Sequence, residues 1–311
     1  MSLKVIFVAG AGRSGSTLLD LMLGASPGAV SVGELRHIWN LGFVQDEFCG
    51  CGEAFSACPF WRQVVDRAFA GSAAVDGAAV SAEQERLLRS RNVIGLAAAR
   101  LASPSLRRAR AEWGERHLRL LRAIAATAGG ASTVVDSSKN PMYGLLLAAL
   151  PEVDLRVIHL VRDSRAVAYS WTKRLKPHPL RDGEPVFDLA EDWQAGSWWL
   201  LANALSETLP ALRRSYLRIR YEDLARRPAP VLAKICAFAG LEPVAHLPGV
   251  PAEYALGVHH TTGGNPLRWE HGITRIRPDT EWKTALAPTT RRAVTAMTFP
   301  LLVRYGYRLR R

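Results

Sequence analysis

Short apolar runs alternate with helical patterns along much of this chain. Residues 3–9 (LKVIFVA) are mostly apolar and rich in β-branched side chains, which predicts a buried strand. Residues 17–24 follow with leucines and a methionine at helical spacing. Three later runs with strand character, at 132–135, 155–161 and 217–221, each precede a predicted helix. These helices are expected over residues 142–150, 164–174 and 228–239.

The repeated order of strand and helix predicts an α/β fold with a parallel central sheet that helices flank on both faces. Residues 61–128 depart from this order, because they are rich in Ala, Leu and Arg and contain no strand-like run. We interpret them as a helical insertion, or lid, within a single domain that spans residues 1–311. The proline-containing residues 175–188 are typical of an exposed loop, and the long aperiodic stretch 247–279 indicates a functional segment.

Composition limits the classes of protein that fit. The 311 residues, 48% of them hydrophobic, are enough for a substantial core, which argues against a disordered chain. The formal net charge of +12 predicts an anionic partner, such as a phosphorylated ligand or an acidic membrane surface. Nucleic acid is not the expected partner, since no helix-turn-helix or zinc-finger pattern is present. The first apolar run is too short to span a membrane and no signal-peptide pattern follows it, so we expect a cytoplasmic protein.

The segment AGAGRSGSTLLD, residues 9–20, joins the first predicted strand to the first predicted helix. It matches the phosphate-loop pattern G-x-x-x-x-G-K-[ST], except that serine stands in place of the lysine. In such a loop the backbone N–H groups and the positive end of the helix dipole hold an anion. The missing lysine makes the segment P-loop-like and argues against a metal-bound triphosphate. We expect ligand contacts from Gly12, Arg13, Ser14, Gly15, Ser16 and Thr17.

Two later predicted strands end in polar clusters. VVDSSKNP places Lys139 just beyond one strand, and HLVRDSRAVAYSW places Arg162 at the tip of another, with Ser170 about two helical turns further on. Because ligands of open parallel sheets collect beyond the carboxyl ends of the strands, we expect Lys139 and Arg162 to face the crevice of the first loop. A capped polar turn, and a surface ion pair between Arg162 and Asp163, are the alternatives.

Together these segments resemble sulfotransferases that use 3′-phosphoadenosine-5′-phosphosulfate (PAPS). The first loop is similar to their 5′-phosphosulfate loop, and HLVRDSRAVAYSW is similar to their 3′-phosphate segment, which assigns Arg162 and Ser170 to the 3′-phosphate. IRYEDL resembles a family segment whose tyrosine, here Tyr221, lies near the nucleotide. GGNPLRW resembles the late loop that closes over the donor, and assigns Arg268 to the 3′-phosphate.

The resemblance implies in-line transfer of a sulfuryl group from PAPS to an acceptor hydroxyl, with the 3′,5′-bisphosphate (PAP) as product. This donor carries no triphosphate, so arginine and backbone amides suffice and no metal is implied. Arg13 and Lys139 are expected to neutralise charge on the transferred group and the bridging oxygen. A nucleoside or small-molecule kinase that uses ATP and magnesium on the same fold is the alternative.

The proton of the acceptor hydroxyl requires a general base. SVGELRHIW resembles the base-bearing segment of the tyrosylprotein branch of the family, so we expect Glu34 to be the base. Pairing with Arg36, or a helix-capping role, is the alternative for the same carboxylate. The rival bases are His37, His259 and His260.

The segment CGCGEAFSACPFW holds Cys49, Cys51 and Cys58. A zinc site would need a fourth ligand, and no second CxxC motif or histidine pair is evident. The expected cytoplasmic setting opposes a disulfide. Similar Cys-Gly segments accompany the first loop in bacterial members of the family that this chain resembles, and the resemblance implies a structural role for these cysteines on the acceptor side.

The acceptor is not named by these motifs, and neither is the oligomeric state. Small-molecule, carbohydrate and lipid hydroxyls all remain open as acceptors. We expect the acceptor pocket to come from the helical insertion and from residues 175–188, because variable loops carry specificity. The arginines of the insertion leave peripheral membrane contact open as well.

Overall fold

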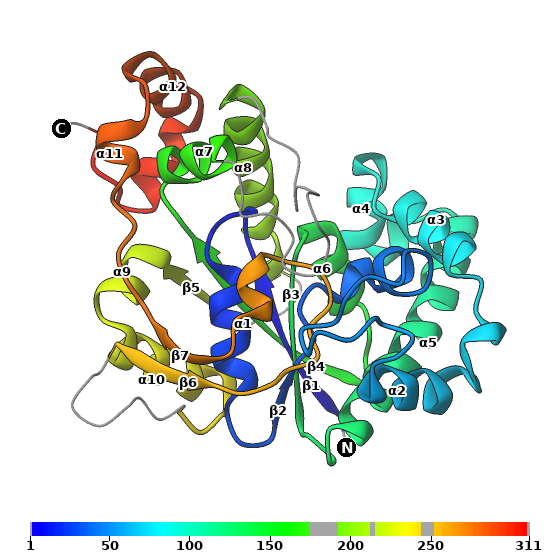
Figure 1. The fold of residues 1–311 in the computed structure, drawn as a ribbon. Helices are drawn as coiled ribbons and strands as arrows, with labels where there is room; N and C mark the ends of the chain where they lie inside the picture. The colour runs from blue at the N-terminus through cyan, green and yellow to red at the C-terminus, as the bar shows by residue number, and fades with distance from the viewer. Residues whose placement is uncertain (1, 174–191, 212–214, 244–251, 310–311) are drawn as a thin grey trace.

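A parallel five-stranded sheet with the order β2-β3-β1-β4-β5 forms the centre of the molecule (Figure 1). The computed structural model describes residues 2–173, 192–211, 215–243 and 252–309. The strands are β1 Leu3–Ala9, β2 Ala29–Ser31, β3 Thr133–Lys139, β4 Val153–Val161 and β5 Tyr216–Arg220. The predicted α/β fold with a parallel central sheet is confirmed. The edge strand β2 was missed, because three residues are too few for an apolar pattern to be visible.

The central strand β1 is buried on both faces. Val5, Phe7 and Ala9 face one hydrophobic core, and Ile6 and Val8 face a second core on the other side of the sheet. Successive side chains of a strand point to opposite faces, so a continuous apolar run supplies both cores at once.

Helices cover both faces of this sheet. α5 (Pro104–Thr127) and α6 (Pro141–Ala148) pack into the first core. α1 (Ser16–Gly24) and α10 (Pro228–Ala239) pack into the second. The predicted helices at 17–24, 142–150 and 228–239 are thus present with boundaries shifted by two residues at most.

The expected helical insertion is present as a packed layer along one flank of the molecule (Figure 1). It consists of α2 (Pro59–Phe69), α3 (Gly77–Leu87) and α4 (Val93–Ala97) together with α5. Trp61 of α2 and Trp113 of α5 are buried in the same core as β1. The insertion therefore contributes to the main core of the fold.

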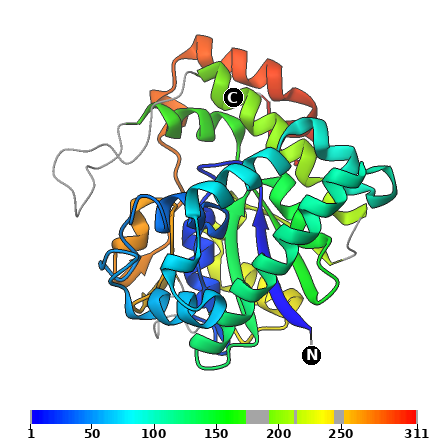
Figure 2. The ribbon, with the colours of Figure 1, turned by 90° about the vertical axis from the view of Figure 1, so that its right-hand side faces the viewer.

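A second group of helices lies beyond the carboxyl ends of the strands (Figures 1 and 2). It consists of α7 Ser164–Thr172, α8 Asp192–Ser206, α11 Trp282–Ala285 and α12 Pro288–Arg304. Val161 at the end of β4 packs with Trp199 of α8 and Leu302 of α12 in one hydrophobic cluster. This cluster fixes the helices above the sheet edge at which ligands of such folds bind.

The remaining elements refine the sequence expectations. Tyr221 opens the helix α9 (Tyr221–Arg226) and does not end β5. The stretch predicted to be irregular contains an antiparallel pair, β6 Glu253–Leu256 with β7 Gly272–Arg275. Residues 175–188 and 247–251 lie outside the described residues. Among the helices that the structure describes, none combines the length and apolar character needed to cross a membrane.

Candidate active site

The loop between β1 and α1 is shaped by left-handed turns. Gly10 has φ 134°, and a Cβ there would lie 2.5 Å from the carbonyl oxygen of Leu160. Gly15 has φ 88° and precedes the first residue of α1; its Cβ would lie 2.6 Å from a ring carbon of Tyr221. Only glycine fits both the backbone angles and the space at these positions. The loop therefore curls tightly at the amino end of α1, as an anion-binding loop requires.

The hydroxyl groups of this loop are buried and partly without partners. Ser14 is 1% exposed, and within the described part of the chain its Oγ has no hydrogen-bond partner. Ser16 is also buried, and Thr17 Oγ1 accepts a hydrogen bond from the backbone N–H of Asn265 (3.3 Å). An unsatisfied buried hydroxyl costs about 1–3 kcal/mol. A phosphate oxygen bound in the loop would supply the missing partner, so the residues present fit such a ligand.

Arg13 turns away from the loop and toward α7. Its Nε donates to Ser170 Oγ (3.1 Å) and its Nη2 donates to the carbonyl oxygen of Ser170 (3.2 Å). The guanidinium also lies 5.7 Å from the ring centroid of Trp171. The expectation that Arg13 serves the transferred group does not match this orientation, because its guanidinium contacts the segment assigned to the 3′-phosphate.

Arg162 connects the strand tip to the loop. Its Nη1 donates to the carbonyl oxygen of Arg13 (2.7 Å), and its Nη2 pairs with Asp279 (2.7 Å). Its guanidinium also stacks on Tyr221, 4.8 Å from the ring centroid. The alternative ion pair with Asp163 is not the contact that Arg162 makes. The two predicted anion sites, the loop after β1 and the tip of β4, are therefore in direct contact. Tyr221 lies between them.

Positive charge is concentrated where these segments meet. Burial, followed by repulsion from the neighbouring Arg162, lowers the pKa of Arg13 to about 10. Two guanidinium groups held this close attract an anion. An open cleft of about 1450 Å³ begins beside them; among the residues that line it are Tyr221, Asp279, Arg165, Arg220, Arg291 and Arg308.

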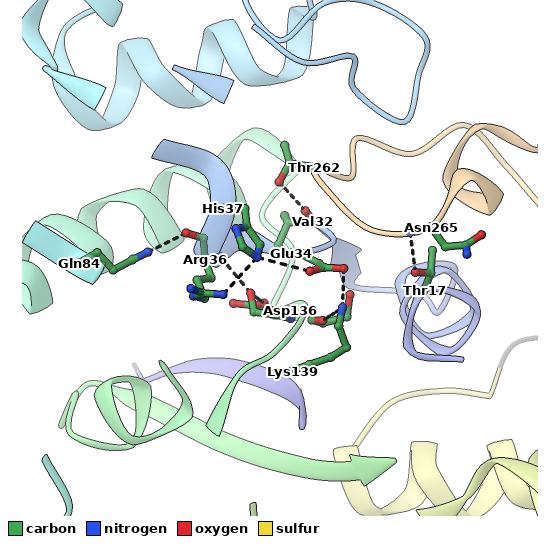
Figure 3. A network of polar contacts seen from close by, with 12 residues as sticks. Thr17, Val32, Glu34, Arg36, His37, Gln84, Asp136, Lys139, Thr262 and Asn265 are labelled. Atoms are coloured by element: carbon green, nitrogen blue, oxygen red, sulfur yellow. Dashed lines mark hydrogen bonds and ion pairs between the residues drawn. The ribbon is translucent and has the colours of Figure 1, made fainter. Parts of the chain in front are cut away.

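The side chains of Glu34 and Lys139 point toward one another and form an ion pair (Figure 3). Lys139 follows a bulge in the pairing of β1 with β3 and has φ 62°, which turns its side chain back across the strand end. Its Nζ donates to Glu34 Oε1 and to the carbonyl oxygen of Ser137 (3.2 Å). His37 Nε2 lies 3.7 Å from Glu34 Oε2. The predicted base and the predicted catalytic cation are therefore direct neighbours.

The Glu34 carboxyl is held in its ionised form. Burial acts to raise its pKa, but the Lys139 ammonium and His37 outweigh burial, so the pKa lies below its usual value. Burial lowers the pKa of His37 against the attraction of Glu34. An ionised carboxylate beside a neutral imidazole is the protonation state that a general base at position 34 needs.

Two buried carboxyl groups support this network. Asp136 accepts hydrogen bonds from the N–H of Ser138 (2.9 Å) and the hydroxyl of Tyr143 (2.9 Å). Ser138 Oγ in turn accepts from the backbone N–H of Arg36 (3.0 Å), so Asp136 orients the segment after Glu34. Burial raises the pKa of Asp136 to about 6.

Asp20 is the second of these carboxyl groups, and the sequence analysis missed it. It is buried in α1 and accepts a hydrogen bond from Ser31 Oγ. Its Oδ1 has no partner among the described residues, and burial raises its pKa to about 8. The sequence signal was a lone aspartate inside an apolar helical run.

The late loop closes over the network. Glu34 N donates to the carbonyl oxygen of Thr262 (2.7 Å). Gly264 has φ 98°, and a Cβ there would lie 3.3 Å from Thr17 Oγ1 and 3.4 Å from Glu34 Oε1. A glycine backbone therefore separates the start of α1 from the carboxylate, and Figure 3 shows Asn265 and Thr17 beside Glu34.

Arg268 is buried between the late loop and the cysteine-containing segment, and its assignment to the 3′-phosphate stays a prediction. It is 3% exposed, and its Nη1 donates to the carbonyl oxygens of Phe48 (2.7 Å) and Thr261 (3.2 Å). Its guanidinium stacks on Trp269 at 4.0 Å. Arg162 and Arg268 have different partners, so Arg268 ties the late loop to the cysteine-containing segment.

The three histidines that were considered as rival bases have different neighbours in the structure. His37 contacts Glu34, as described above. His259 lies 3.2 Å from Thr261 Oγ1, and burial lowers its pKa to about 4. His260 lies against Cys58, with 3.3 Å between Nδ1 and Sγ. The expectation that the cysteines lack a nearby fourth ligand is therefore wrong, because His260 comes to them from a segment about 200 residues away in sequence.

Comparison with known proteins agrees with this geometry. The model of a sulfotransferase family matches residues 5–245. The chain is 32% identical to carbohydrate sulfotransferase 5 of Mus musculus over 128 residues, which cover 37% of this chain and 30% of that protein. It is 30% identical to carbohydrate sulfotransferase 5 of Homo sapiens over 174 residues, which cover 51% of this chain and 41% of that protein. The matched segments span less than half of either relative.

A solved structure with a similar fold is the sulfotransferase domain from the curacin biosynthetic pathway. Its TM-score is 0.51 at 18% sequence identity, and the alignment covers 99% of each chain. At this identity the comparison establishes the likeness of fold, including the parallel sheet and its flanking helices.

Proposed function

Because this chain belongs to the sulfotransferase family, we propose that it transfers a sulfuryl group from PAPS to an acceptor hydroxyl and releases PAP. The observation that carries this proposal is the hydrogen bond from Arg162 Nη1 to the carbonyl oxygen of Arg13 (2.7 Å). A nucleotide with phosphates on both its 5′ and 3′ positions needs two anion sites that adjoin each other. The loop after β1 and the tip of β4 are two such sites.

The donor would be held from two sides. The backbone of Gly12 to Thr17 and the unpartnered Ser14 hydroxyl suit the 5′-phosphosulfate, at the positive end of α1. Arg162 and Ser170, with Arg13 between them, suit the 3′-phosphate. Tyr221 packs against both Gly15 and Arg162, which supports a position of its ring beside the nucleotide between the two phosphates.

Glu34 is the general base in this proposal, and Lys139 is its partner. As the acceptor oxygen bonds to sulfur and the bond from sulfur to the 5′-phosphate oxygen breaks, the acceptor proton passes to Glu34 and the electron pair stays on PAP. Lys139 is close enough to Glu34 to hold it ionised before the reaction. A rotation of its long side chain toward the leaving oxygen would release the carboxylate and neutralise the developing charge.

A carbohydrate hydroxyl is the acceptor class that the relatives favour, since the two named above are carbohydrate sulfotransferases. Small-molecule and lipid hydroxyls stay open. The cytoplasmic location expected from the sequence is likewise retained as a proposal.

The kinase alternative lacks support at the loop, where Ser16 occupies the place of the lysine that holds a triphosphate. Thermal unfolding with PAP and with ATP-magnesium separates the two functions. A ligand at about one hundred times its Kd adds about 2.7 kcal/mol to the free energy of unfolding, which is a rise of several degrees in Tm. We expect this rise with PAP. In a separate assay, we expect the protein to transfer radiolabelled sulfuryl groups from PAPS to at least one member of a panel of carbohydrates. Stabilisation by ATP-magnesium together with no response to PAP would reverse the assignment.

A further inference from the structure

Three cysteines and one histidine converge at the edge of the helical insertion. Cys49, Cys51 and Cys58 come from the segment before α2, and His260 comes from the late loop. The four potential ligand atoms, three Sγ and one Nδ1 or Nε2, all lie within 4.8 Å of one another. None of the three thiols forms a disulfide in this structure. The cluster takes no part in the chemistry proposed above.

Four of the six separations between these atoms are close to the edges of a tetrahedron around one zinc ion, and the other two lie within 4.8 Å. Cys58 Sγ lies 3.7 Å from Cys49 Sγ and 3.7 Å from Cys51 Sγ. His260 Nδ1 lies 3.3 Å from Cys58 Sγ and 3.7 Å from Cys49 Sγ. Tetrahedral zinc, with Zn–S of about 2.3 Å and Zn–N of about 2.0–2.1 Å, requires edges of about 3.8 Å between sulfurs and about 3.6 Å between sulfur and nitrogen. A disulfide would instead bring one pair of sulfurs to about 2.0 Å.

The surrounding residues hold the ligands in place without a metal. Trp61 Nε1 donates to the carbonyl oxygen of His260 (3.0 Å), and Phe60 stacks on the His260 ring at 4.7 Å. Gly50 N donates to the carbonyl oxygen of Thr261 (3.0 Å), and a Cβ at Gly50 would lie 2.5 Å from His259 Nδ1. The glycine between the first two cysteines is therefore needed for the late loop to approach.

The sulfurs also receive backbone donors. The N–H groups of Cys51, Glu53 and Trp61 hydrogen-bond to the sulfurs of Cys49, Cys51 and Cys58 respectively. Cys49 and Cys58 are fully buried.

We propose that Cys49, Cys51, Cys58 and His260 bind one structural Zn²⁺. Three thiolates and one imidazole are a complete ligand set, so the ion has no open position for catalysis. The metal ties the segment before α2 to the late loop, which carries Gly264 and Asn265 over Glu34 and Thr17. Zinc therefore fixes the loop that covers the proposed donor site.

Metal analysis of the full chain, purified under reducing conditions and incubated with zinc sulfate, tests the site independently of sulfuryl transfer. We expect one tightly held zinc per chain after gel filtration. His260→Ala should lose it, whereas His259→Ala, its neighbour in the same loop, should retain it. Cys51→Ser should lose it, whereas Cys236→Ser, in the buried face of α10, should retain it.

If a variant fails to fold, measurements on the wild-type chain still test the zinc site. A chelator should lower Tm and zinc should restore it, and cobalt should give the visible absorption of a tetrahedral thiolate site. Absence of stoichiometric zinc in the reduced wild type would overturn the proposal, and so would equal retention of zinc by the His260 and His259 variants. A disulfide between two of the three cysteines in the reduced, zinc-treated protein would do the same.

Discussion

Glu34 and Lys139 neutralise each other in this structure, and the proposed chemistry depends on that pair at the scale of single residues. The Glu34 carboxylate is ionised but paired with Lys139. In the proposal it can accept a proton only after the Lys139 ammonium has moved to another anion. A bound sulfuryl donor is such an anion. This links base activation to donor binding through one side chain.

Glu34→Gln keeps the size of the side chain and a hydrogen-bond acceptor for Lys139, but removes the base. We expect turnover to fall by about 10²–10⁴ with unchanged affinity for PAP. The matched control is Glu85→Gln, which removes an exposed partner of Arg36 in the same region. Turnover of the Glu34 variant within about twofold of wild type would transfer the role to His37.

Asp20 gives a prediction on pH. Burial raises the folded-state pKa of Asp20 to about 8, well above the ordinary value of an aspartate, so the folded state binds a proton that the unfolded state releases. Its contribution to stability is complete below about pH 4 and is lost as the pH rises through about 8. The free energy of unfolding of wild type should therefore fall between pH 5 and pH 9, roughly the window of this titration. Urea unfolding at the two pH values should show a smaller fall for Asp20→Asn. An unchanged pH dependence in the variant would contradict the buried, protonated state of Asp20.

The positions of single residues could be predicted where a motif fixes the backbone. The contacts of long side chains could not be predicted. Glu34 and Lys139 meet because Glu34 follows the end of β2 and Lys139 ends the neighbouring strand β3. The guanidinium groups of Arg13 and Arg268 point to partners that are distant in sequence, and a pattern of residue types carries no information on such partners. Asp20 was missed because burial, which gives it its role, is a property of the fold.

At the scale of elements, apolar runs were sufficient for β1, β4 and β5 and for the start of β3 (Thr133–Lys139), whose second half is polar and was predicted to lie beyond the strand. Strands that are buried on both faces leave a continuous signal in the sequence. The pair β6 and β7 leaves none, because each strand has four residues and β7 has no buried side chain. The contact between the late loop and the segment before α2 could not be predicted from the sequence either, because about 200 residues separate His260 from Cys58.

Gly264 tests the role of the late loop. Gly264 and Gly272 both have φ 98°, so alanine causes similar backbone strain at either position. A Cβ at Gly264 would crowd Thr17 and Glu34, whereas a Cβ at Gly272 has nothing within 4 Å. We expect both alanine variants to lose similar stability in urea unfolding, and only Gly264→Ala to lose turnover, by roughly 10–10². Equal turnover of the two variants would show that the late loop is not part of the site.

At the scale of the whole molecule, Arg13 and Arg162 connect the helices beyond the sheet to the loop after β1, which is the region that the proposal assigns to the two phosphates of the donor. Arg162 leaves the tip of β4, bonds to the loop and pairs with Asp279, while Arg13 crosses from the loop to α7. The family predicted from the motifs is confirmed by the match over residues 5–245. The net charge of +12 predicts an anionic partner but carries no information on where that partner binds.

The most direct test of the central claim is calorimetric binding of PAP and of adenosine 5′-phosphate to the same protein. A hydrogen bond to a charged group contributes about 1.5–3 kcal/mol, so the wild type should prefer PAP by roughly tenfold or more. Changing Arg162 and Ser170 together to alanine should abolish that preference, while Arg156→Ala, on the same strand and paired with Asp154, should keep it. Equal affinity of the wild-type protein for the two nucleotides would contradict the account.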